Sequence, residues 1–480
     1  MASPEAKLTI KDGALGIVQS SDNGTVALVG TCSLGTINQV YAFTDQQTLK
    51  DTLGTGQLVE LAAFILAIAG GTVICVKAPS STAGTNTAVT KTGTAGASVV
   101  TVTGTPLDSY QVIVKMVTGS AANTSGTALL VYSLDNGRTW SPQYTLPASG
   151  SFAIPNTGLT AVFGVGTVGA GDQYSWTSTG PSYTTAELNT ALDAVLADSR
   201  DFFCVSPVGV PADAAAFSAI FGALNTKLAS AETTLFRYLA GAMQGNDDTD
   251  ANLITSGAAL TSTRIAVGGG FANLTSPISG SQYRRPAIWE ALARAAAVRP
   301  SEDLARVASG PLLGCAALVR DEFKTPGLDA ARFTTLRTHI GLPGFYVNNC
   351  RLFSSPTSDF QFLQHRRVMD MASKTVRTAQ LYYLNDSVTV YGNKPEVPSE
   401  KRGRITEEAA RAIETRIEGQ LRSVITQPGH ASDVSVRVDR TENILSTSTL
   451  RVKYSVVPLG YLKAIEGEIG YANPALQLVS

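Results

Sequence analysis

Short apolar runs and polar connectors alternate over the first eighty residues of the chain. Two of these runs, residues 25–31 and 72–78, are short and rich in β-branched residues, which is typical of buried strands. Residues 57–69 lie between them and are apolar on nearly every side, and Gly70 with Gly71 supplies a helix C-terminal stop. The pattern predicts a strand, a buried helix and a second strand, with the two strands parallel.

The pattern changes between residues 81 and 180, where Thr, Ser, Gly and Val dominate and charged residues are few. Alternating runs at 98–102, 110–117 and 128–134 are separated by Gly, Asn and Pro, which favours a small antiparallel β-sandwich. Within this segment Asp135-Asn136-Gly137 has the composition of a tight turn between strands.

An α/β pattern resumes after the β-rich segment. Residues 185–198 predict a helix with a capped start, residues 202–206 a short strand, and residues 212–229 a long Ala-rich helix. The β-rich segment is therefore interpreted as an insertion into one α/β domain, rather than as a separate domain between two others.

The last third of the chain predicts a compact α+β domain. Residues 406–425 form an amphipathic helical pattern, and residues 434–439 and 449–457 alternate strictly between apolar and polar positions. A helix over 365–381 belongs to the same domain. The predicted organisation is an N-terminal arm (1–24), a discontinuous α/β core (25–80 and 181–345), the insertion (81–180), a C-terminal α+β domain (346–460) and a C-terminal arm (461–480).

Composition excludes several classes of partner. The chain of 480 residues is 44% hydrophobic and 16% charged, and its net charge of -1 gives no basic field for a nucleic acid. The longest apolar block, residues 58–69, is far shorter than the ~20 residues of a membrane span. The five cysteines occur singly, and the opening residues lack a secretion signal, which predicts synthesis in the cytosol.

Motifs for catalysis, cofactors or metals are lacking. The sequence contains no phosphate loop, nucleophile elbow or HExxH, and the glycines at 268–270 favour a flexible loop over a nucleotide site. The three histidines have no partner at metal-ligand spacing. Asp247, Asp248 and Asp250 could suggest calcium, but a solvated loop is the preferred interpretation. No enzyme activity, cofactor or metal is predicted.

A basic stretch on the predicted helix at 365–381 has two interpretations. Arg366, Arg367, Lys374 and Arg377 could form a solvated surface, which is the common role of such residues. They could instead form a docking strip for an acidic partner, because Arg366 and Arg377 are about three turns apart.

The chain resembles the sheath subunit of phage-type contractile tails. Residues 25–78 carry a VALVG strand, an LG, a helix, a GG and a strand ending in VKA, as in the opening module of that family. The segment NNCRL at 348–352 and the finish RVKYSVVPLGYLKAIEGEIGY are similar to its inner domain and terminal strand. YSLDNGRTWS and GAGDQYSW are similar to a β module in one branch of these proteins.

The resemblance implies a structural protein. Identical subunits would polymerise helically around a tail tube protein, contact baseplate and tail terminator proteins, and contract from a metastable extended state without a cofactor. Arms at the chain ends would add strands to neighbouring subunits, and the basic helix would face the tube. The virion tail, assembled in the host cytoplasm, would be its location. The implied arm residues are Leu8, Ile10 and Leu15 at one end and Leu462, Ile465, Ile469 and Tyr471 at the other.

Two alternatives remain open. An α/β nucleotide-binding enzyme would share the alternation of strands and helices, although its motifs are missing. Another self-assembling phage protein, such as a tube or baseplate component, is the second, and chain length favours a sheath over a tube. The sequence does not distinguish an infectious phage from a phage-derived injection device.

Overall fold

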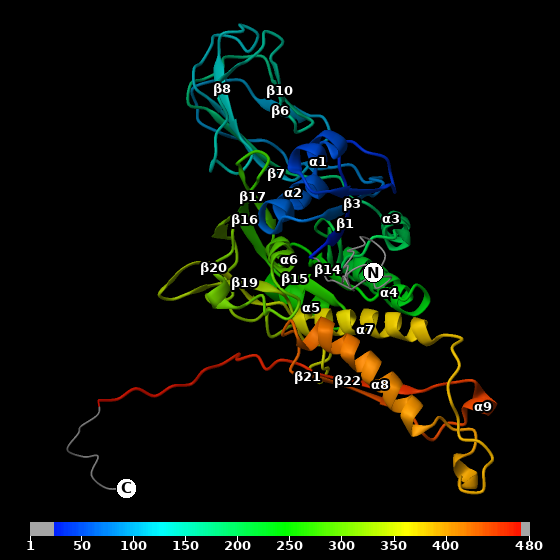
Figure 1. Cartoon of the computed structure of the whole chain (residues 1–480). Helices are drawn as coiled ribbons and strands as arrows, with labels where there is room; N and C mark the ends of the chain where they lie inside the picture. Colours follow the sequence, from blue (N-terminus) through cyan, green and yellow to red (C-terminus); the bar gives the residue numbers. More distant parts are fainter. Residues whose placement is uncertain (1–23, 472–480) are drawn as a thin grey trace, which may run out of the picture.

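The computed structural model describes residues 24–471, and its centre is a largely parallel sheet with helices on both faces (Figure 1). Within this range the strand order is β15-β14-β13-β1-β3-β2, and only β2 runs antiparallel to its neighbour. The strands are β1 (Val26–Gly30), β2 (Val40–Phe43), β3 (Val73–Lys77), β13 (Cys204–Pro207), β14 (Ala240–Gln244) and β15 (Ile265–Gly268).

Burial on both faces explains why the central strands are apolar throughout. Val26 and Leu28 of β1 pack with α1, α2 and α6, whereas Ala27 and Val29 pack with α3, α4 and α5 on the other face. The helices are α1 (Gln46–Leu53), α2 (Gln57–Ala69), α3 (Thr185–Ala197), α4 (Ala214–Thr234), α5 (Asp250–Gly257) and α6 (Ala287–Ala297).

The predicted strand, helix and strand at the start of the chain are confirmed. Helix α2 has the predicted bounds, β1 and β3 pair in parallel, and Gly70 ends the helix with φ at +64°. The predicted capped start of α3 is also present, because the Thr184 hydroxyl accepts from the Glu187 backbone N–H and the Glu187 carboxylate accepts from Thr184.

The segment between β3 and α3 forms two antiparallel sheets that share a hydrophobic core (Figure 1, top). Strand β7 alternates buried and half-buried side chains along its length, as expected for a strand with one face on a core. The first sheet contains β4 (Thr85–Asn86), β5 (Thr90–Thr92), β7 (Tyr110–Met116), β8 (Leu129–Ser133), β9 (Tyr144–Thr145) and β12 (Gln173–Thr179). The second contains β6 (Val100–Thr103), β10 (Ser151–Ile154) and β11 (Leu159–Phe163).

A buried joint fixes this inserted segment to the core. The Arg285 guanidinium donates to both carboxylate oxygens of Asp108, at 2.9 and 2.6 Å, and the two side chains are only 3% and 2% exposed. The Gln282 backbone N–H donates to Asp135 at 2.9 Å. The inserted segment and the core are therefore held by buried charge-assisted bonds and not by the chain connections alone.

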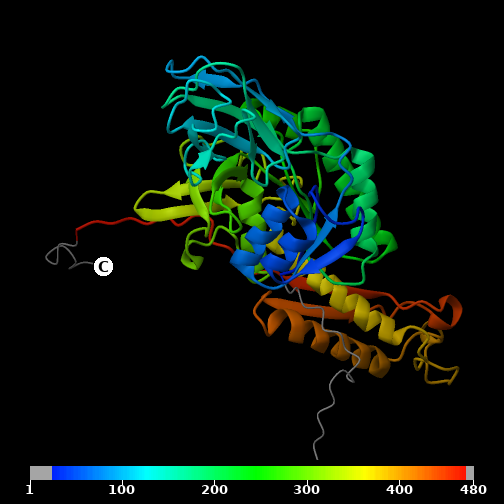
Figure 2. The ribbon, with the colours of Figure 1, turned by 90° about the horizontal axis from the view of Figure 1, so that it is seen from above.

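An antiparallel region continues the core between residues 271 and 349. It contains the sheet β17-β16-β18 and the hairpin β19–β20, which projects from the body (Figure 2). The bounds are β16 (Phe271–Thr275), β17 (Gln282–Pro286), a 3-10 turn (Val307–Ser309), β18 (Cys315–Leu318), β19 (Thr335–His339) and β20 (Leu342–Asn349).

The C-terminal domain has its own hydrophobic core beneath the end of a long helix, α7. Val434, Val436 and Val438 alternate toward that core, as predicted. Glu407 pairs with Arg411 on α8, and Glu418 pairs with Arg422 in the turn that follows it. The elements are α7 (Leu363–Tyr383), a 3-10 turn (Ser399–Lys401), α8 (Glu407–Leu421), a π-helical turn (Arg422–Thr426), β21 (Asp433–Val438), α9 (Ile444–Thr447) and β22 (Val452–Val457).

The domain boundary predicted at residues 345 and 346 falls inside strand β20. Cys350, Leu352 and Phe353, which follow β20, are buried in the core of the first domain. The C-terminal domain therefore begins with α7, because the hydrophobic contacts change partners there. No helix within residues 24–471 is long and apolar enough to span a membrane.

Candidate assembly interface

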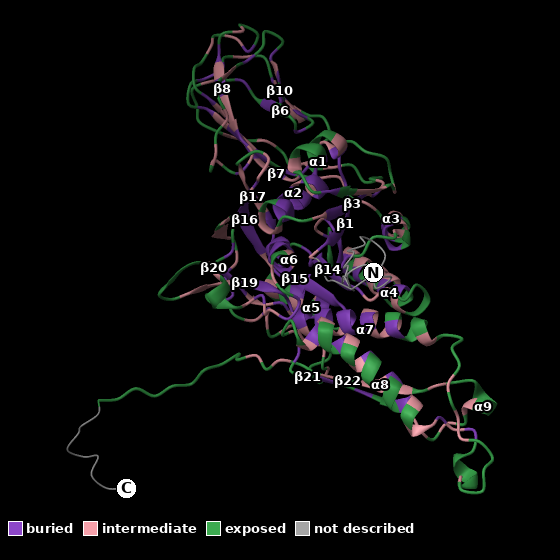
Figure 3. Cartoon of the chain, viewed as in Figure 1, coloured by how far each residue is buried: buried purple, intermediate pink, exposed green. Residues whose placement is uncertain are grey.

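The most exposed apolar stretch of the described chain is the segment after β22. Residues 461–471 have no regular secondary structure and run away from the body as an extended trace (Figure 1, red; Figure 3, green). Leu462 and Ile465 are 85% and 84% exposed, and Ile469 and Tyr471 are fully exposed. These apolar side chains can be removed from water only if a partner covers them.

The start of this segment is anchored. The Tyr461 hydroxyl donates to the Ser301 carbonyl at 2.7 Å, and burial raises the pKa of Tyr461 to about 12. Lys463 donates to Asn349 at 2.8 Å and pairs with Asp303. The chain is thus fixed up to Lys463 and projects beyond it.

The β21–β22 hairpin offers one open strand edge, that of β22. Between residues 24 and 471, β21 pairs with β22 and with no further strand, and β22 likewise. The outer edge of β21 is already bonded within the chain, because the Val438 N–H donates to Glu414 and the carbonyls of Val434 and Val438 accept from arginine side chains. Helix α8 covers one face of the pair through Val434, Val436 and Val438. Unpaired edges of this kind accept an added strand from another chain.

Two sequence-family matches cover nearly the whole chain. The family model described as "DUF2586, N-terminal domain" matches residues 4–351, and the family model described as "DUF2586, C-terminal domain" matches residues 359–476. The chain belongs to the DUF2586 family. The junction between the two matches agrees with the boundary before α7. No curated protein matches the sequence of this DUF2586 chain significantly.

The DUF2586 chain has the fold of contractile sheath proteins. It matches a chain of the anti-feeding prophage (AFP) baseplate in its contracted state with TM-score 0.55 and 12% identity, covering 99% of this chain and 98% of that one. It matches the contracted PVC sheath complex of an extracellular contractile injection system with TM-score 0.54, 10% identity and 98% coverage of both. The match to the contracted AFP helical sheath has a TM-score of 0.52 and 11% identity, and it covers 98% of this chain and 100% of that one. The predicted sheath resemblance and the mixed α/β multidomain architecture are confirmed at the level of fold.

The exposed cationic strip expected on α7 of the DUF2586 chain is contradicted for two of its residues. Arg366 and Arg367 are buried, since the first pairs with Asp370 at 2.6 Å and reaches Glu232, and the second donates to the Ala295 carbonyl at 2.7 Å. Because both arginines are buried and contact residues outside α7, they join this helix to the core.

The other two predicted basic residues of α7 are also engaged within the chain. Lys374 pairs with Asp201 at 2.7 Å, and the Arg377 guanidinium lies 3.6 Å from the centre of the Phe236 ring. A tube-facing role for this helix stays a prediction. The N-terminal arm residues Leu8, Ile10 and Leu15 lie outside the described residues.

The glycines at 268–270 are packed, so the expected flexible loop is wrong. A Cβ added at Gly268 would lie 2.9 Å from the backbone nitrogen of Ile288, and one at Gly269 would lie 2.9 Å from Leu328. The backbone therefore passes too close to its neighbours for a side chain. The glycines serve packing.

The acidic loop that could suggest calcium is engaged in ion pairs. Asp247 pairs with Arg284 at 2.7 Å and Asp250 with Arg320 at 2.8 Å. Over residues 24–471 no group of three or more His, Cys, Asp or Glu side chains could hold a metal ion.

A cavity of about 570 Å³ lies at the carboxyl ends of β13 and β14, where α/β proteins commonly bind ligands. Its two arginines, Arg284 and Arg285, are each paired with an aspartate of the same chain. The cationic groups at this position thus already have anionic partners, and the pair of Arg285 with Asp108 joins the inserted segment to the core.

One buried carboxyl in the core predicts a pH-dependent stability. Glu290 on α6 is 0% exposed, and among the described residues neither carboxyl oxygen has a hydrogen-bond partner. Burial raises the pKa of Glu290 from 4.5 to about 8, and Arg294 opposes this rise. Between pH 4.5 and about 8 the carboxyl group is protonated in the folded protein and ionises on unfolding. The contribution of Glu290 to the free energy of unfolding is therefore fully present below pH 4.5 and is lost as the pH rises to about 8.

We expect Glu290→Gln to remove this part of the pH dependence, because the amide cannot ionise. A tenfold difference between the acid dissociation constants of Glu290 in the folded and the unfolded chain corresponds to about 1.4 kcal/mol in the free energy of unfolding. Urea unfolding at pH 5 and at pH 8.5 measures the difference. The exposed Glu408→Gln is the control and should behave as the wild type. An unchanged pH dependence in Glu290→Gln would show that Glu290 is ionised in the folded protein.

Proposed function

We propose that this DUF2586 protein is the sheath subunit of a contractile tail or injection device. Subunits polymerise helically around an inner tube, and the polymer contracts from a metastable extended state to drive the tube through the target envelope. The observation that carries this proposal is the sheath fold over 98% of both chains in the match to the contracted PVC sheath. An exposed apolar terminus is the second support.

The C-terminal arm, residues 461–471, is proposed to link one subunit to the next. Its stripe of Ile465, Ile469 and Tyr471 occupies alternate positions, as in a strand with one apolar face. The unpaired edge of β22 in a neighbouring copy is the acceptor that fits it. Backbone hydrogen bonds in such an added strand persist while other contacts slide, which suits a contracting lattice.

The proposed partners are those that a sheath role requires. The subunit binds itself, the tail tube protein, and the baseplate and terminator proteins at the two ends of the tail, and the virion tail is its location after assembly in the host cytoplasm. Work comes from the lower free energy of the contracted lattice, so the proposal requires no enzyme activity and no cofactor.

Negative-stain electron microscopy of the purified full chain tests the proposal. Hollow cylinders of uniform diameter are the expected result. A protein that stays monomeric across salt, concentration and added tube protein would contradict it.

The inserted segment, residues 81–180, is proposed to decorate the outer surface as a β-sandwich. It lies at the opposite end of the molecule from the C-terminal domain (Figure 1) and has few charges for binding a tube. We expect that deletion of the segment, with Ala78 joined to Tyr183, leaves a protein that still polymerises.

The deletion also removes Asp108, the buried partner of Arg285. Without Asp108 its guanidinium would be left without its buried partner, so Arg285→Met accompanies the deletion. Full-length Arg285→Met with Asp108→Leu is the matched control. Electron microscopy and circular dichroism read out the result, and a folded deletion variant found only as a monomer would place the segment in the lattice.

A further inference from the structure

We propose that the tip of the β19–β20 hairpin is a second contact between copies of this chain, beside the C-terminal arm. This inference rests on the proposed self-assembly and adds a surface that neither the fold nor the arm supplies. The tip is formed by Ile340 and Leu342, which are 85% and 45% exposed. Two apolar side chains at the end of a projecting hairpin are unfavourable in water and suit a partner surface.

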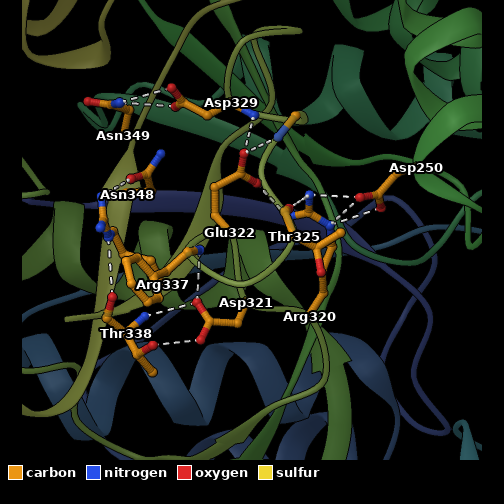
Figure 4. A network of polar contacts seen from close by, with 12 residues as sticks. Asp250, Arg320, Asp321, Glu322, Thr325, Asp329, Arg337, Thr338, Asn348 and Asn349 are labelled. Atoms are coloured by element: carbon orange, nitrogen blue, oxygen red, sulfur yellow. Dashed lines mark hydrogen bonds and ion pairs between the residues drawn. The ribbon is translucent and has the colours of Figure 1, made fainter. Parts of the chain in front are cut away.

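A polar network braces the hairpin (Figure 4). Asp321 accepts from the Thr338 backbone N–H at 3.0 Å and from its hydroxyl at 2.6 Å. Across the hairpin, Arg337 donates to Asn348 at 3.1 Å. These bonds hold β19 and β20 against the neighbouring loop.

A second part of the network fixes that loop. Arg320 pairs with Asp250 at 2.8 Å and with Glu322 at 2.5 Å, and Glu322 accepts from the backbone N–H groups of Gly327 and Asp329. The tip is therefore presented on a preorganised support, which lowers the entropy lost when it binds.

The position of the arm identifies the occupant as a second copy of this chain. Asn349 at the end of β20 donates to Asp329 and accepts from Lys463, so the hairpin and the arm leave the body from one place. Both project to the same side in two perpendicular views (Figures 1 and 2).

The arm reaches farther than the hairpin. It spans ~26 Å from Lys463 to Tyr471 when extended, at about 3.3 Å per residue. Tyr346 and Val347 of β20 are buried, so the hairpin projects only beyond them. A neighbour that receives the arm close to its anchor therefore lies beside the hairpin tip. The contact is heterologous, and it repeats along a helical polymer.

The test replaces the two tip residues in the full chain by Ile340→Asp with Leu342→Asp. We expect the critical concentration for polymerisation, measured by sedimentation, to rise by about tenfold or more, since two apolar side chains would lose their buried contact. The thermal unfolding temperature should stay within a few degrees of the wild type, because the tip makes little contact within its own subunit.

Val165→Asp is the matched control, because Val165 is 97% exposed on the inserted segment. It should polymerise as the wild type does. Ile340→Ser repeats the test with a smaller change, in case the aspartates disturb the hairpin. The proposal is overturned if both tip variants polymerise at the same critical concentration as the wild type. This holds also if those variants lose binding to the tube or the baseplate, because the tip would then contact another protein and not a second copy. Failure of the wild type to polymerise would instead contradict the proposed function.

Discussion

Deletion of residues 464–480 is expected to give a folded subunit that no longer forms cylinders. The truncation keeps the anchors Tyr461 and Lys463, and the described residues that it removes are exposed, so the subunit loses few contacts of its own. The contact between subunits, in contrast, loses the whole added strand. Three backbone hydrogen bonds of about 1 kcal/mol each would already change an association constant about a hundredfold.

Circular dichroism measures folding of the truncated subunit, and sedimentation with electron microscopy measures assembly. Glu466→Gln with Glu468→Gln is the control, because it alters the polar side of the arm and keeps Ile465 and Ile469. That control should form cylinders. A truncated chain that polymerises as readily as the full chain would show that other contacts hold the lattice together.

Asp108→Ala is expected to destabilise the subunit by roughly 3 to 5 kcal/mol. The substitution leaves Arg285 buried without its carboxylate, and an uncompensated buried charge is among the most costly single changes. Urea unfolding gives the loss in the free energy of unfolding.

An exposed pair provides the comparison for this variant. Asp193→Asn removes the partner of Lys227 on the surface, where such pairs contribute about 0 to 1 kcal/mol. If Asp108→Ala costs no more than Asp193→Asn, water reaches Arg285, and the joint does not fix the inserted segment.

Local elements could be predicted from the sequence where one short segment determines them. The continuous apolar pattern of α2 and the two glycines after it gave the bounds of that helix, because burial on all sides and a C-terminal stop are local properties. The capped start of α3 and the alternation in β21 are confirmed for the same reason.

Long-range pairs could not be predicted in this way. Asp108 and Arg285 are separated by 177 positions, and nothing in either local sequence shows that the two side chains meet. The same limit explains the error at Arg366 and Arg367. A basic run on a helix is commonly solvated. The spacing of Arg366 and Asp370 was a local signal for one ion pair, but only the fold shows that Glu232 and the Ala295 carbonyl also lie there.

The candidate interface was predicted in part. The resemblance to sheath proteins implied an arm that contains Leu462, Ile465, Ile469 and Tyr471, and these residues are exposed. The anchoring of Tyr461 and Lys463 on the core depends on contacts between distant segments. The sequence contains no local signal for them.

A cryo-electron microscopy map of the assembled polymer tests the central claim most directly. The account predicts that residues 464–471 of each subunit lie as a strand along the β21–β22 hairpin of a neighbouring copy, with Ile465 and Ile469 covered. A map in which this segment folds back onto its own subunit, or in which neighbouring copies meet without it, would contradict the account.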